Sequence, residues 1–106
     1  MTVTDDIRLW EMERRLVVGM FDGYVSRGII AQDLSDQPAR AGLEALRRLQ
    51  QDGLQAPGLD GMFRALAGIG DGSLPLLERC YPVTRTEFEA AHRFVAGAII
   101  RRRVRE

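Results

Sequence analysis

Residues 16–30 read LVVGMFDGYVSRGII, and this stretch decides the fold class of the chain. Its apolar side chains continue the three- and four-residue steps set by Leu9 and Met12, which is typical of a broad helical face. The pair Asp22-Gly23 between two apolar runs is also a strong signal for a β-hairpin. We favour a helix over residues 5–31, because the periodicity crosses this pair without interruption. A hairpin over residues 16–30 would instead give an α+β fold.

Further helices are predicted after this stretch, each set off by glycine or proline. The first covers residues 39–51, follows the capping sequence Ser35-Asp36-Gln37-Pro38 and ends at Gly53. Two shorter helices are expected over residues 59–69 and 73–80.

The last helix begins at Thr84 or Thr86, since each threonine has a glutamate three residues later and can form a capping box. Its C-terminal end carries a cluster of arginines, whose charges complement the negative end of the helix dipole. Together the segments predict a mainly α fold, with four to five short helices in a compact bundle. At this length we expect residues 1–106 to form a single domain.

The composition predicts a globular chain with no general attraction to polyanions. Of its 106 residues 45% are hydrophobic and 28% are charged, and the net charge is zero. No global field therefore favours nucleic acid or an acidic membrane, and no apolar run reaches the ~18 residues of a membrane span. All fifteen basic residues are arginine, a bias typical of a GC-rich, bacterial-like genome. The single cysteine and the lack of a signal-peptide pattern predict a cytoplasmic protein.

Few residues offer the chemistry that a catalytic, metal or cofactor site needs. His92 is the only histidine and Cys80 the only cysteine, and the sequence places no partner beside either one. We interpret His92 as a boundary residue of the last helix and Cys80 as a small buried hydrophobe. The usual Cys and His spacings of a metal site are missing, and the glycine-rich residues 68–73 lack the lysine of a phosphate loop. We expect no catalytic residue, no metal and no cofactor.

The first helix is apolar around more of its circumference than a surface helix needs. This excess predicts a non-enzymatic protein-interaction module, a small regulator, adaptor or inhibitor that binds a protein partner and forms a homodimer. The candidate interface consists of large apolar side chains from the first and last helices: Trp10, Val17, Phe21, Tyr24 and Phe94.

Residues 28–54 offer an alternative reading. Residues 28–34, the turn at 35–38 and residues 39–54 together resemble a helix-turn-helix, and residues 45–54 are similar to the recognition helix of winged-helix regulators. The resemblance implies a DNA-binding transcriptional regulator that contacts nucleic acid through Gln37, Arg40, Arg47 and Arg48. We place it second, because acidic side chains outnumber basic ones over residues 33–52 and no β-wing pattern follows. A third reading is a small or accessory enzyme subunit whose site is completed across an interface.

Overall fold

Helices make up all of the regular structure in the part of the chain that the structure, a computed structural model, describes: residues 3–70 and 72–105. The α-helices are α1 (Val3–Phe21), α2 (Gln37–Gln51), α3 (Gly58–Leu66), α4 (Ser73–Glu78) and α5 (Arg85–Arg105), and a 3₁₀-helix η1 covers Ala31–Asp33. The mainly α fold predicted from the sequence is confirmed. The two short helices α3 and α4 also lie where the glycine and proline breaks place them.

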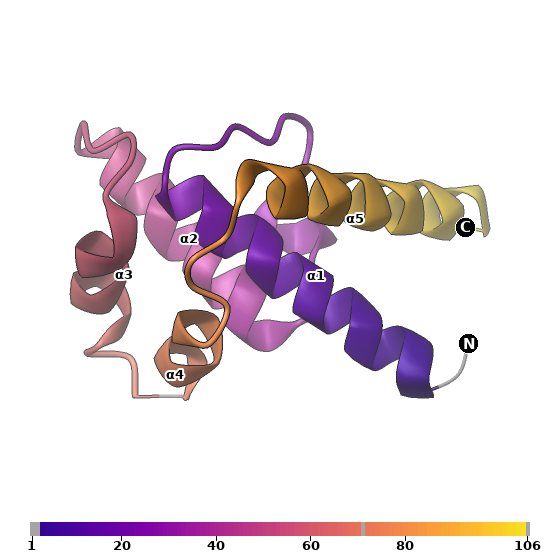
Figure 1. Cartoon of the computed structure of the whole chain (residues 1–106), viewed down its shortest axis with the longest axis horizontal. Coiled ribbons are helices and arrows are strands. Elements are labelled where there is room, and N and C mark those ends of the chain that lie inside the picture. The colour runs from indigo at the N-terminus through magenta and orange to yellow at the C-terminus, as the bar shows by residue number, and fades with distance from the viewer. Residues whose placement is uncertain (1–2, 71, 106) are drawn as a thin grey trace.

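Helix α1 is the centre of the packing, because α2, α3, α4 and α5 all contact it. Its most extensive contact is with α5, which runs antiparallel across it, so that the start of α1 and the end of α5 lie on the same side of the molecule (Figure 1). The side chains from Leu16 to Val18 and at Met20 and Phe21 are all buried in the core. The wide apolar circumference of α1 is therefore covered by the chain's own helices.

The Asp22-Gly23 pair ends α1 and does not start a hairpin. Gly23 has a φ of 101°, a left-handed conformation that glycine adopts without strain. Its N–H bonds the carbonyl of Met20 at 3.0 Å, and the N–H of Tyr24 bonds the carbonyl of Gly19 at 3.1 Å. These two bonds form a Schellman motif, which satisfies the last carbonyls of the helix. The prediction of a helix to about residue 31 is wrong beyond Phe21, and no strand forms over residues 16–30.

Two charged side chains of α1 fix the start of α2. The Asp36 carboxylate caps α2 by accepting the N–H of Ala39, and it also receives Nε and Nη2 of Arg14 at 2.9 and 2.8 Å. The buried carboxylate of Glu13 accepts the N–H groups of Ser35 and Asp36. Burial raises the pKa of Glu13, since removal from water disfavours the charged form.

Helix α5 begins with a reciprocal capping box that uses the first of the two predicted threonines. Glu87 N–H donates to Oγ1 of Thr84, and Thr84 N–H donates to Oε1 of Glu87, both at 3.1 Å. The hydrogen bonds from Thr84 lower the pKa of Glu87, because they favour its charged form.

Across residues 3–70 and 72–105, none of the helices combines the length and the apolar character that a membrane span requires.

Candidate functional site

The loop of residues 22–30 is tied to α5 by a side-chain hydrogen bond. Oγ of Ser26 lies 2.7 Å from Nδ1 of His92, and only 5% of Ser26 is exposed. Two residues earlier, the Tyr24 ring packs against Phe88 with a centroid distance of 5.1 Å. These contacts hold the start of the loop in one position relative to α5.

Our expectation that His92 has no partner is wrong, because the fold brings Ser26 to it. The two residues are 66 positions apart in the chain, so no local pattern indicates that they meet. A nucleophilic serine needs a base, an orienting group on that base and access to substrate. Ser26 is buried, and no carboxylate of the described residues hydrogen-bonds the His92 ring. The pair is suited to positioning the loop.

The 3₁₀-helix η1, which follows this loop, is tied to the C-terminal part of α5 through Asp33. Nη1 of Arg102 donates to the main-chain oxygen of Asp33 at 3.1 Å, and Nη2 of Arg103 donates to the Asp33 carboxylate at 3.1 Å. Asp33 also accepts the N–H of Ile30 with its side chain. Part of the arginine cluster therefore has a structural role that its position near the helix end did not predict.

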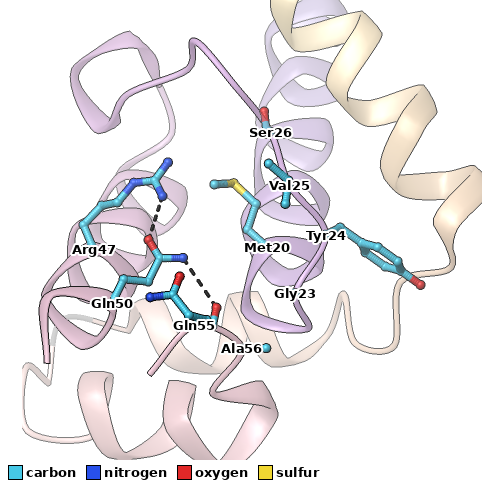
Figure 2. Close-up of a pocket in the computed structure, with 9 residues that line it drawn as sticks. All are labelled: Met20, Gly23, Tyr24, Val25, Ser26, Arg47, Gln50, Gln55 and Ala56. Carbon is cyan, nitrogen blue, oxygen red and sulfur yellow. Dashed lines mark hydrogen bonds between the residues drawn. The ribbon is translucent and has the colours of Figure 1, made fainter. Parts of the chain in front are cut away.

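A hollow of about 270 Å³ opens between this loop and the C-terminal half of α2 (Figure 2). Met20, Tyr24, Val25 and Ser26 lie on one side, and Arg47 and Gln50 face them from α2 (Figure 2). The floor is closed by Gly23, Gln55 and Ala56. Nη1 of Arg47 donates to Oε1 of Gln50 at 2.7 Å, and Nε2 of Gln50 points at the main-chain oxygen of Gln55 at 3.5 Å.

A second hollow, of about 520 Å³, shares Arg47 with the first as a lining residue. It lies between η1 and the outer face of α2. We call the two hollows together the α2 groove, defined by the residues that line either one: Met20, Gly23, Tyr24, Val25, Ser26, Ile30, Ala31, Gln32, Glu44, Arg47, Arg48, Gln50, Gln51, Gln55 and Ala56. Val25 is 71% exposed and Ile30 is 55% exposed, so two large aliphatic side chains stand on its rim.

The structure separates the five residues of the predicted interface. Val17 and Phe21 are buried in the core, at 0% and 1% exposure, so they cannot form a surface for a second copy, and that part of the prediction is wrong. Tyr24 is half-buried against Phe88 and lines the α2 groove. Trp10 is 37% exposed on α1, and the guanidinium of Arg8 lies over the Phe94 ring at 5.0 Å. No single surface contains all five.

The helix-turn-helix resemblance is not matched by the local structure. Over residues 28–34 the only helical element is η1, a single 3₁₀ turn of three residues. On α2, Gln37, Arg47 and Arg48 are exposed. Arg40 is half-buried and donates twice to the main-chain oxygen of Leu34, at 3.2 and 2.7 Å. The helix that would position a recognition helix is therefore missing, and one of the four candidate contacts is engaged within the chain.

Cys80 is a free, half-buried thiol at the end of α4. Its Sγ lies 3.7 Å from the main-chain oxygen of Leu76, and burial raises the pKa of the thiol. A raised pKa keeps the neutral form, which is neither a nucleophile nor a metal ligand. In the ranges that the structure describes, no three His, Cys, Asp or Glu side chains come together in a group that would hold a metal ion.

Sequence reasoning identified Tyr24, Arg47 and Arg48 but assigned them to different functions, and it missed the rest of the groove. The available signal was the unusual composition of residues 24–30, which are rich in β-branched side chains and lie in a loop. Comparison with protein-family models, with curated proteins and with solved structures finds no match to this chain.

Proposed function

We propose that this protein is a non-enzymatic protein-interaction module, a small regulator, adaptor or inhibitor that binds a protein partner at the α2 groove. One observation carries the proposal: Val25 and Ile30 expose most of their aliphatic surface on a loop that α5 holds at Ser26 and at Asp33. Loops placed by a rigid scaffold are common binding elements. Apolar side chains fixed in such a position lose little conformational freedom when a partner covers them.

The groove supplies polar partners beside these apolar side chains. Arg47 and Arg48 offer guanidinium donors, Gln50 offers an amide on the same wall, and Gln55 offers another on the floor. A mixture of exposed aliphatic groups, arginine and amides is suited to a protein interface, where arginine is enriched and a polar rim surrounds an apolar centre.

A photo-crosslinking experiment in the native host tests the proposal. Benzoylphenylalanine is placed at Ile30, and at Ile69 as a control, because Ile69 is also exposed but lies outside the groove. We expect one protein to be linked from position 30 and not from position 69. Adding Val25→Asp to the Ile30 variant should remove that product. Equal products from both positions, or none from position 30, would contradict the proposal.

DNA binding is the second candidate, and the exposure of Gln37, Arg47 and Arg48 on α2 favours it. Most of the affinity of such proteins comes from arginine and lysine contacts to phosphates, and it falls steeply with salt. Fluorescence anisotropy with a random-sequence duplex at about 150 mM salt distinguishes the two candidates. Binding that is lost in an Arg47→Ala and Arg48→Ala double variant would favour DNA.

We further propose that the protein forms a homodimer and acts in the cytoplasm. Trp10 and Ile7 are exposed apolar side chains of α1 outside the α2 groove, and a second copy would cover them. The free thiol of Cys80 fits a reducing compartment.

A further inference from the structure

The main chain of residues 25–29 has the hydrogen-bonding capacity of an unpaired strand edge. Within the described residues, none of its N–H or C=O groups bonds another part of the chain. The segment is bounded by two satisfied groups, Tyr24 N–H on the carbonyl of Gly19 and Ile30 N–H on the carboxylate of Asp33. Such a row of donors and acceptors is a template for pairing with another chain.

The side chains of this segment alternate in exposure as they do in a β-strand. Tyr24 and Ser26 face α5, through Phe88 and His92 respectively, whereas Val25 and Arg27 are exposed. Successive side chains point to opposite sides in extended backbone, so this pattern indicates an extended run over residues 24–27. Gly28, with a φ of 82°, ends the run.

The α2 groove lies beside the extended run and adds charge complementarity. Among the residues that line the first hollow, Arg47 is the only charged one, and two amides accompany it. The second hollow adds Arg48 against a single carboxylate, Glu44, and Arg27 is exposed on the loop itself. An occupant with a carboxylate is therefore favoured over a basic one.

We propose that the partner of the α2 groove presents an extended peptide segment with an acidic side chain. Its main chain pairs with residues 25–27, its carboxylate binds Arg47, and an apolar side chain packs against Val25. A helical ligand is a poorer fit, since its main-chain groups already bond one another and would leave the open groups of residues 25–27 without a partner. The inference rests on the proposed function, of which it specifies the class of partner.

A displayed library of random heptapeptides, selected against the immobilised full chain, tests this inference. We expect the enriched sequences to contain Asp or Glu with an apolar residue two positions away, the spacing of one face of a strand. A synthetic peptide of the enriched sequence should bind Arg47→Ala at least about tenfold more weakly than wild type. Arg64→Ala is the matched control, because Arg64 is exposed on α3 and lies outside the groove.

Backbone pairing has a signature that side-chain binding does not produce. N-methylation of the peptide, one residue at a time, should weaken binding at alternate positions, because every second N–H in a strand faces its neighbour. Among residues 25–27, the amides that face the peptide, which are alternate ones, should also exchange more slowly with solvent when the peptide is bound. Both measurements use the wild-type protein, and the variants compared for affinity are those whose circular dichroism matches it.

The outcomes separate this inference from the proposed function. If Val25→Asp and Arg47→Ala weaken peptide binding but N-methylation has no alternating effect, the proposed strand pairing is wrong. The proposed function, binding of a protein at the groove, then still stands. If neither variant changes binding, both are wrong. A selection that enriches no peptide, or a duplex DNA that binds through Arg47, overturns the inference.

Discussion

The carboxylate of Glu13 accepts the N–H of Asp36 at 2.7 Å, so an acid in the middle of α1 holds the first turn of α2. It is fully buried, and the nearby carboxylate of Asp36 adds to the burial that raises its pKa. A group whose pKa is raised on folding stabilises the folded state below its unfolded pKa, and this contribution is lost as the pH rises through the folded value.

Glu13→Gln should therefore gain stability relative to wild type as the pH rises. Gln keeps an oxygen for the two N–H groups but carries no charge. The unfolding free energy of Glu13→Gln should therefore rise relative to that of wild type from about pH 4 towards pH 7. Urea unfolding at several pH values measures it. Glu13→Ala, which removes the acceptor altogether, should be less stable than either protein at every pH. A difference between Glu13→Gln and wild type that does not change with pH would contradict the raised pKa.

Ser26→Ala should cost about 1 kcal/mol of unfolding free energy, the usual value of one side-chain hydrogen bond. His92→Gln tests the other side of the same bond. Because the two groups share one interaction, the double variant should be less destabilised than the sum of the two single changes. Chemical denaturation of the four proteins gives the coupling free energy, and additive effects would mean that the bond does not hold the loop.

Gly42→Ala should lower the unfolding free energy by about 1–3 kcal/mol, the cost of overpacking a core. An added Cβ would lie 2.8 Å from Cδ1 of Leu77 and 2.9 Å from Cγ1 of Val17, and both of these side chains are fully buried. Gly68 is the matched control, since a Cβ there would meet nothing within 4 Å and its backbone does not need glycine. Gly68→Ala should be neutral or slightly stabilising. Thermal melts of both variants compare them directly. Equal melting temperatures would show that the space around Gly42, between α2 and Leu77 of α4, is wider than the structure has it.

Trp10→Glu should convert the proposed dimer into a monomer. Trp10 is partly exposed on α1, so the substitution replaces apolar surface by a charge on the face that a second copy would cover. Sedimentation velocity at tens of micromolar compares it with wild type and with Ile69→Glu, which changes an exposed isoleucine elsewhere on the molecule. A wild type that sediments as a monomer would rule out the dimer.

Local signals in the sequence were sufficient to place the starts of α2 and α5. Asp36 caps α2 and Thr84 caps α5 because short-range side-chain bonds satisfy the first N–H groups of a helix. At Asp22-Gly23 the local signal was ambiguous, since a glycine with positive φ serves both a hairpin and a helix end. Only the packing of α1 against four other helices decides between them.

The candidate site depends on contacts that the sequence does not encode locally. Periodicity marked Phe21 as apolar, but it cannot distinguish a side chain that faces another helix of the same chain from one that faces a second copy. The hydrogen bond between Ser26 and His92 could not be predicted either, because the residues around each one have the same local pattern whether or not the two side chains meet. The α2 groove was missed for the same reason: its two walls come from the loop after α1 and from α2, and each wall alone looks like ordinary surface.

The anchors of the loop also bear on the order in which a newly made chain forms the proposed binding surface. Ser26 and Asp33 depend on partners 66, 69 and 70 residues later, all of them in α5. At about 5–20 residues per second, synthesis of α5 takes roughly 1–4 seconds, so the partner of Ser26 is made first and the partners of Asp33 follow near the end of the helix. Both walls of the α2 groove lie before α5 in the chain, and we expect the loop wall to reach the fixed position that the proposed binding needs only after α5 has been made.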